Sequence, residues 1–221
     1  GLLWLQGDPA AAEREFADIA ASAGPEGLDD AVLRGNALNS RGVCLRDMGR
    51  FEEAESVLKE ALSIRLRNGG PDSATVADTH MNLASLYVRW GRGSEALPCA
   101  REAARIRQVR GRWTAPLESE SRAMIGRAQM LMDGPEAALE ELQHAWQIRF
   151  HRGLLTNWQT NIAVDGLLEA LHALGRDEEA KRVADIEHAE LTELVGPDNA
   201  ATKLAAQRRA NVVQRIAKKP R

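Results

Sequence analysis

The sequence predicts an all-α fold, in which antiparallel helix pairs stack into a right-handed α-solenoid that ends in a C-terminal capping helix. Three observations predict it. Glycine and alanine positions recur with a period of 42 residues, apolar residues between them follow helical spacing, and aromatic residues make up only 4% of the chain. A period of this length is typical of repeats built from helix pairs, whereas β-sandwiches and barrels draw on aromatic and β-branched residues.

Composition places the chain among ordinary globular proteins. Its 221 residues are 44% hydrophobic and 28% charged, which is enough apolar material for a packed core. The net charge of −3 does not predict a nucleic-acid-binding protein. No run of about 18 apolar residues occurs, so we expect no transmembrane helix, no membrane partner and a cytoplasmic location. Arginine outnumbers lysine 24 to 5 among many alanines and glycines, a bias that favours a bacterial source.

The repeat is visible in the turn between two helical segments. Gly49-Arg50 returns as Gly91-Arg92 and Gly175-Arg176, and Asp133-Gly134 fills the remaining position of the period. A glycine after an apolar helical segment ends a helix, because it adopts the left-handed backbone conformation without strain. Five residues beyond the start of each turn lies an alanine, and the four are Ala54, Ala96, Ala138 and Ala180.

Each period predicts two amphipathic helices. In the first full copy, small and apolar residues recur at helical spacing before the turn, at Ala37, Leu38, Gly42, Leu45 and Met48. The second segment, residues 51–65, begins with acidic residues that suit the helix dipole and places on one face Ala54, Leu58, Ala61 and Ile64. Alanine and glycine at fixed positions allow two helices to approach closely.

The period assigns the elements in order along the chain. Projected backwards, it meets Gly7 and Ala12, so a partial repeat, mostly its second helix, is expected first. The last 23 residues include seven basic and no acidic ones, and they are expected to form a basic capping helix and tail. The expected divisions are 1–30 for the partial repeat, 31–72, 73–114, 115–156 and 157–197 for four full repeats, and 198–221 for the cap.

Two copies depart from the pattern. Copy three has polar Gln129 where a bulky residue is expected. Copy four has Leu168 at a position that is small in the other three copies, and Glu187 where alanine recurs. Because a leucine and a carboxylate need more room than glycine or alanine, we expect the last pair to splay or to pack differently against the C-terminal helix.

These positions resemble the tetratricopeptide repeat (TPR) family over about residues 2–217. The family places a small and a bulky residue in the first helix and two alanines in the second, and the first two copies fill these positions with Gly42, Leu45, Ala54, Ala61, Ala84, Tyr87, Ala96 and Ala103. The period, the linker Gly70-Pro71-Asp72-Ser73-Ala74-Thr75 and the segment Asn82-Leu83-Ala84 are similar to the kinesin-light-chain subtype. The resemblance implies a TPR superhelix with a concave groove.

The resemblance also implies that the first helix of each repeat lines this groove and that the groove binds a partner protein or peptide. Asparagine amides can bind a peptide backbone whatever its sequence, and arginine forks onto carboxylate or phosphate groups. Arg46, Arg89 and Arg127 therefore predict a preference for an acidic or phosphorylated segment; alternatively, they are solvated on helix faces. The candidate groove residues are Asn39, Val43, Arg46, Met81, Asn82, Ser85, Arg89, Arg127, Met130, Asp165, Glu169, Arg208, Asn211 and Arg215.

Motifs that carry catalysis were not found. The sequence contains no phosphate-binding loop, nucleophile elbow or zinc-protease motif, and its five histidines form no i,i+4 pair on one helix. The predicted function is therefore a non-catalytic protein–protein interaction scaffold, without a catalytic residue, cofactor or metal site. The sequence does not fix its oligomeric state.

Two alternatives stay open. Leu2-Leu3-Trp4-Leu5 looks like the end of a first helix whose start is missing. By family resemblance, this favours a regulatory or sensor module of a larger bacterial enzyme, such as a kinase, protease or nucleotide-binding protein. Nucleic-acid contact through the basic C-terminal helix ranks lower, because no aromatic residue interleaves its charges.

Overall fold

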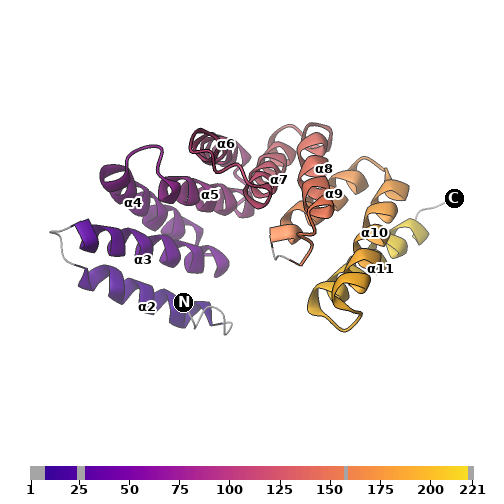
Figure 1. The fold of residues 1–221 in the computed structure, drawn as a ribbon, viewed down its shortest axis with the longest axis horizontal. Coiled ribbons are helices and arrows are strands. Elements are labelled where there is room, and N and C mark those ends of the chain that lie inside the picture. The colour runs from indigo at the N-terminus through magenta and orange to yellow at the C-terminus, as the bar shows by residue number, and fades with distance from the viewer. Residues whose placement is uncertain (1–7, 24–27, 157–158, 219–221) are drawn as a thin grey trace. The chain divides into compact units, whose positions relative to one another are not determined.

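The computed structural model describes residues 8–23, 28–156 and 159–218, which form ten helices and no strand (Figure 1). They fall into two compact units, residues 1–113 and residues 114–221. The predicted all-α fold class is confirmed. The expected partial repeat includes residues 1–7 and 24–27, and the basic tail includes residues 219–221, which all lie outside the described residues.

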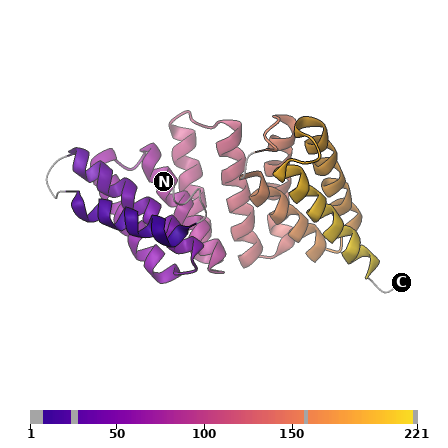
Figure 2. The same ribbon diagram turned by 90° about the horizontal axis from the view of Figure 1, so that it is seen from below.

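The first unit is a series of helices in which each packs on the next. In Figure 2 these helices, indigo to magenta, lie side by side and alternate in direction. Their bounds are α2 Pro9–Ser22, α3 Leu28–Asp47, α4 Phe51–Gly69, α5 Ala74–Arg89 and α6 Gly93–Val109. Helices α3 and α5 also contact each other directly, so the first helices of two successive copies are neighbours.

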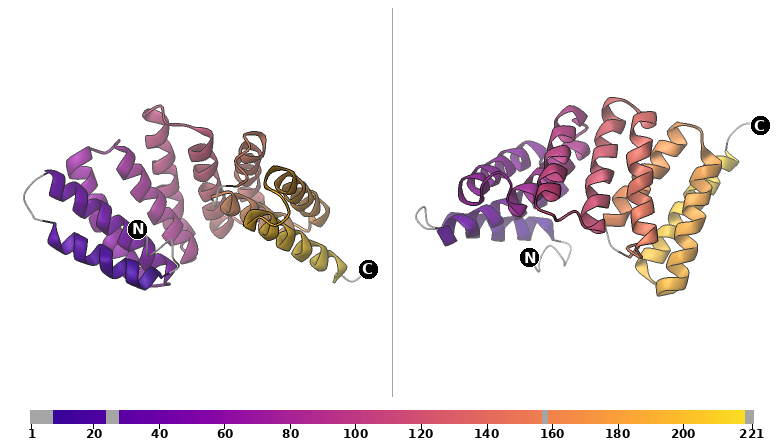
Figure 3. Two further views of the ribbon diagram at one scale, coloured as in Figure 1. Left: turned by 60° about the horizontal axis from the view of Figure 1, so that its bottom comes forward. Right: turned by 45° about the horizontal axis from the view of Figure 1, so that its top comes forward.

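The second unit repeats this arrangement. Helix α7 packs on α8 and α9, α8 on α9, α9 on α10, and α10 on α11, as the pink to yellow helices in Figure 3 show. Their bounds are α7 Ala115–Met132, α8 Pro135–His151, α9 Gln159–Ala173, α10 Asp177–Val195 and α11 Ala200–Ala217. None of the described helices combines the length and apolarity that a membrane crossing requires.

The glycine turns lie where the period places them. Gly49, Gly91 and Gly175 have φ angles of 75°, 77° and 70°, in the left-handed region that favours glycine. After the first of these glycines, the backbone N–H of Arg50 donates to the carbonyl of Leu45 at 2.9 Å, which closes the end of α3. Equivalent bonds follow Gly91 and Gly175. The predicted helix-ending glycines therefore end these helices as a glycine cap does.

A glycine and a leucine fit together at the contact between paired helices. A Cβ atom added to Gly42 on α3 would lie 2.5 Å from Cγ of Leu58 on α4, and one added to Gly126 on α7 would lie 2.7 Å from Cγ of Leu142 on α8. Both leucines are fully buried. The absence of a side chain on the first helix therefore makes the room that the leucine of the second helix fills.

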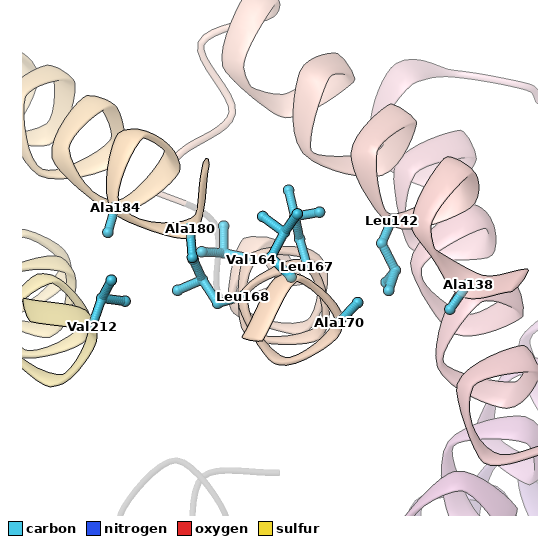
Figure 4. Packing of buried hydrophobic residues seen from close by; sticks show 10 residues of the cluster. Ala138, Leu142, Val164, Leu167, Leu168, Ala170, Ala180, Ala184 and Val212 are labelled. Carbon is cyan, nitrogen blue, oxygen red and sulfur yellow. The ribbon is translucent and has the colours of Figure 1, made fainter. Parts of the chain in front are cut away.

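Copy four exchanges the sizes at this contact. Leu168 of α9 stands at the position of the glycines, and Ala184 of α10 stands at the position of the leucines; both are buried in one core cluster with Val212 (Figure 4). In copy two, both positions are the buried alanines Ala84 and Ala100. The leucine that departed from the repeat pattern is thus accommodated, because its counterpart on the second helix is small.

A buried arginine ties the end of α8 to the start of α7. Arg149 is 0% exposed, and its Nε donates to Oγ of Ser119 at 2.7 Å. Ser119 in turn donates to the carbonyl of Ala145 at 2.8 Å. Arg65 occupies the equivalent end of α4, where it donates to Oγ1 of Thr79 at 2.7 Å. Burial lowers the pKa of both guanidinium groups.

Candidate functional site

Six of the seven predicted groove residues of the first unit gather on one surface of two adjacent helices; Met81 does not. We name it the α3–α5 surface; it consists of Asn39, Val43, Arg46, Asn82, Ser85 and Arg89 together with Asp47. The amide of Asn82 donates to Oδ1 of Asn39 at 3.1 Å, so the two asparagines of successive copies are paired. Both are partly exposed, and each keeps hydrogen-bonding groups that this contact does not use.

Two arginines of the α3–α5 surface share one carboxylate. Arg46 donates to Oδ1 of Asp47 from Nη2 at 2.8 Å, and its Nη1 donates to Oγ of Ser85 at 3.1 Å. Arg89 of the next copy donates to the same Oδ1 atom from Nη1 at 3.2 Å. The side chain of Arg46 is 14% exposed and that of Arg89 is 51% exposed. This surface therefore carries two guanidinium groups on one carboxylate, and Arg89 is the accessible one.

Two apolar residues predicted for the groove lie in or against the core. Met81 is 4% exposed. Met130 of the second unit is partly buried and packs against the core cluster that contains Leu142 and Leu168. Their side chains offer a ligand little or no surface. Val43, by contrast, is partly exposed on α3.

In the second unit, α9 and α11 enclose a cleft of about 540 Å³. We name it the α9–α11 cleft. Its floor includes Leu168 and Val212, which are buried. The cleft brings together five of the predicted groove residues with five others; the predicted ones are Asp165, Glu169, Arg208, Asn211 and Arg215, and the others are Leu168, His172, Val212, Gln214 and Lys218.

Arg208 is held in a buried network below this cleft. It is 7% exposed, and it donates to Oδ1 of Asp165 at 2.7 Å, to Oε1 of Glu187 at 3.0 Å and to Oδ1 of Asn161 at 2.9 Å. Its guanidinium group therefore joins α11 to α9 and α10. Glu187 is the residue that replaces alanine in copy four, so this departure from the pattern is matched by an arginine on the capping helix.

The electrostatics of this network are dominated by burial. Glu187 is 1% exposed, and within the described part of the chain its Oε2 has no hydrogen-bond partner. Desolvation raises the pKa of the Glu187 carboxyl to about 7, although the neighbouring Arg208 acts in the opposite direction. A carboxyl group in such a place is costly to ionise.

The two rims of the α9–α11 cleft carry opposite charges. Asp165 and Glu169 on α9 have side chains that are 54% and 61% exposed. Arg215 on α11 and Lys218 directly after its end are exposed and form no ion pair with another described residue. Glu169 also lies 3.7 Å from Nη2 of Arg127, measured from its Oε2 atom.

The basic C-terminal segment is partly neutralised within the protein. Of the five basic residues that the structure describes there, Arg208 binds two carboxylates, Arg209 pairs with Asp185, and Lys203 lies 3.6 Å from Asp198. Only Arg215 and Lys218 among these five are without such a partner. The segment therefore presents less free positive charge than its composition indicates.

Sequence reasoning missed several members of these sites. Asp47 carried no motif, and its role follows from two arginines that reach it from different copies. Gln214, Lys218 and Val212 enter the cleft because α11 packs beside α9, which residue spacing alone does not show. No group of three or more His, Cys, Asp or Glu side chains that could hold a metal ion occurs among the described residues.

Comparison with known proteins supports the fold. Residues 33–108 match a family model described as tetratricopeptide repeat. The structure is similar to a putative kinesin light chain of Podosopora anserina with nearly identical TPR-like repeats, at a TM-score of 0.68 and 15% identity, over 84% of this chain and 88% of that one. It is also similar to BtubC (BKLC) from P. vanneervenii, at a TM-score of 0.65 and 16% identity, over 98% and 95%. No curated protein sequence matches.

The protein is therefore of the tetratricopeptide-repeat type in its fold. The predicted resemblance to TPR repeats of the kinesin-light-chain kind is confirmed. Repeat folds of this kind typically serve as scaffolds for protein–protein interaction, and they are generally non-catalytic.

Proposed function

We propose that this protein is a non-catalytic interaction module that binds an acidic, extended segment of a partner protein. The segment binds on the surface formed by the first helix of each repeat. We further propose the bacterial cytoplasm as its setting. The observation that carries the proposal is the sharing of the Asp47 carboxylate by Arg46 and Arg89 on the α3–α5 surface. One carboxylate leaves this pair with a net positive charge, and a carboxylate or phosphate group of a ligand would balance it.

The neighbouring asparagines supply the contact that is independent of ligand sequence. Asn39 and Asn82 use one donor and one acceptor on each other. The remaining groups of both amides are able to bind the backbone N–H and C=O of an extended chain. A ligand is thus held along its backbone by the asparagines and selected for charge by Arg89.

The α9–α11 cleft is a second place for the same kind of ligand. Its apolar floor at Leu168 and Val212 suits one side chain of a partner, and the exposed cations Arg215 and Lys218 suit an acidic residue next to it. Asp165 and Glu169 on the opposite rim disfavour a ligand that is acidic along its whole length. This cleft therefore favours a segment with mixed character.

A selection from a random-sequence peptide display library on the intact chain tests the proposal. We expect the selected peptides to be enriched in Asp and Glu, and a synthetic copy of one to lose about tenfold or more in affinity for Arg89→Glu. Arg101→Glu, an exposed arginine of α6, serves as the control and should bind as the wild type does. Peptides without acidic enrichment, or equal affinity for Arg89→Glu, would contradict the proposal.

The alternative of a regulatory module in a larger enzyme uses the same surfaces. In that case the bound segment belongs to an attached domain, and the selected sequences would match that domain. We do not propose nucleic-acid binding, because three of the five described basic residues of the C-terminal segment are paired with carboxylates.

A further inference from the structure

Within the part of the chain that the structure describes, no helix covers the outer face of α11, although the repeat pattern places a second helix there. Gly196-Pro197-Asp198 before α11 repeats Gly70-Pro71-Asp72 before α5, three periods earlier. Helix α11 is thus the first helix of a pair by sequence position. It packs on α10, the second helix of the preceding pair (Figure 1). No second helix follows it among the described residues.

The side chains of this face are the ones that other copies bury. Val213 is 43% exposed, whereas Leu45, Tyr87 and Leu171, at the same position of the period in three copies, are 0%, 4% and 1% exposed; copy three has the partly exposed Gln129 there. Ala210, at the position of the tightly packed Gly42, is also exposed. Small side chains surround Val213 on this face, at Ala206, Ala210 and Ala217, and the polar side chains that border them are Gln207, Arg209, Asn211 and Gln214.

The charge at the end of α11 indicates what would cover this face. Lys218 stands at the position of Arg50, Arg92 and Arg176. Each of these arginines binds an acidic residue in the first turn of the second helix, and the ion pairs are Arg50 with Glu53 at 2.6 Å, Arg92 with Glu95 at 2.7 Å and Arg176 with Glu179 at 2.6 Å. Lys218 is exposed, and no described carboxylate pairs with it. In the three repeats, arginine and glutamate are three residues apart in the chain. Lys218 offers its charge instead to an acidic residue of an incoming helix that lies beside α11.

We propose that the α11 outer face (Ala206, Ala210, Val213, Ala217 and Lys218) docks an amphipathic helix of a partner protein. The partner helix runs antiparallel to α11 and carries Asp or Glu in its first turn, next to Lys218. It places alanine or leucine opposite Ala210, because these are the residues that oppose Ala84, Gly42 and Gly126 in the pairs of this chain. The interaction differs from the proposed peptide binding, because its ligand is helical and not extended, and because it shares only Lys218 with the cations of the α9–α11 cleft.

A peptide taken from this chain is a suitable probe. Residues 51–69, the α4 sequence, have Glu52 and Glu53 in the first turn and Leu58 in the apolar stripe. A fluorescently labelled peptide of this sequence should bind the intact protein and gain helical circular dichroism on binding. Val213→Asp should weaken binding at least about tenfold, because it places a charge in the apolar contact.

Two further variants separate this site from other binding places. Leu204→Asp is the matched control: Leu204 is an exposed residue of the same helix, and Asp78 stands at its position in α5, so binding should not change. Lys218→Glu should weaken binding of the α4 peptide by about two- to fivefold. A peptide with Glu52→Lys and Glu53→Lys should instead bind Lys218→Glu more tightly than it binds the wild type. If Val213→Asp binds the peptide as tightly as the wild type does, the proposal is wrong. That result would follow if the peptide replaced α4 in the fold and did not bind α11.

The oligomeric state gives an independent outcome. We expect sedimentation to show that the intact protein does not self-associate through this face. Wild type and Val213→Asp should therefore have the same oligomeric state. If such self-association is found, the occupant of the face is a second copy of this chain, and the assignment to a partner helix is wrong.

Discussion

Arg208 on α11 and Glu187 on α10 form a buried ion pair, with Nη1 3.0 Å from Oε1, at a position where the second helices of the other full repeats carry alanine. Without Arg208, the buried carboxyl of Glu187 would have no cation beside it to favour its ionised form. Arg208 also binds Asp165 and Asn161 on α9. The capping helix is thereby fixed to both helices of the last repeat.

Glu187 should make the stability of the protein depend on pH. Burial raises its pKa from 4.5 to about 7. Between these values the native state keeps a proton that the unfolded state has lost, so the free energy of unfolding falls as pH rises from about 4.5 to about 7. Urea unfolding at pH 5 and pH 8 measures this fall, which should be on the order of 2–3 kcal/mol larger in the wild type than in Glu187→Gln.

The exposed Glu193 on the same helix supplies the control for this experiment. Glu193→Gln should keep the pH dependence of the wild type. If Glu187→Gln keeps it as well, the carboxyl of Glu187 does not titrate in this range and the assignment is wrong.

The contact between Gly42 and Leu58 should be exchangeable as a pair. Gly42→Leu alone should destabilise the protein by about 1–3 kcal/mol through overpacking. Leu58→Ala alone should cost about 2–5 kcal/mol because it leaves a cavity. The double variant reproduces the arrangement of Leu168 and Ala184, so it should be more stable than the sum of the two single losses predicts. Additive losses in a double-mutant cycle would show that the two positions do not share one volume.

Removal of the buried Arg149 should destabilise the second unit strongly. Arg149→Ala leaves a cavity and removes the donor to Ser119, so we expect a loss of about 3–5 kcal/mol in the free energy of unfolding. Arg152→Ala changes an exposed arginine one residue after the same helix and should have little effect. A small loss in Arg149→Ala would mean that the region relaxes around the missing side chain.

Asp47 should limit the affinity of the α3–α5 surface for acidic ligands. Asp47→Asn removes the charge that Arg46 and Arg89 share, so an acidic peptide selected on the wild type should bind about two- to fivefold more tightly. Glu52→Gln, an exposed residue of α4, removes the same charge elsewhere. Equal gains in both variants would point to net charge, not to these two arginines, as the cause.

Much of the fold follows from local sequence signals. Glycines such as Gly49 end helices for a backbone reason that needs no tertiary context, and the alanine at Ala54 marks a close helix contact. The exchange of Leu168 with Ala184 was also open to sequence reasoning. In three of the four full copies, a small or large residue of the first helix is followed 16 residues later by one of the opposite size, as with Gly42 and Leu58; in copy two, both positions are alanine.

The candidate sites were less predictable, because their chemistry depends on contacts between copies. Register alone placed Met81 and Arg208 on the groove, whereas the structure buries both. Asp47 takes hydrogen bonds from Arg46 of its own helix and Arg89 of the next first helix, which lie 43 residues apart. Such a link depends on how α3 and α5 pack, and no single repeat encodes it.

The alternating sizes at the helix contact also limit how the repeats of such a chain can recombine. A second helix that carries Leu58 fits a partner with glycine, and one that carries Ala184 fits a partner with Leu168. A crossover inside a pair would join Leu168 to Leu58, or Gly42 to Ala184, and produce a clash or a void. Recombination that keeps each helix pair intact preserves these complementary sizes. We therefore expect viable crossovers in the linkers between helix pairs.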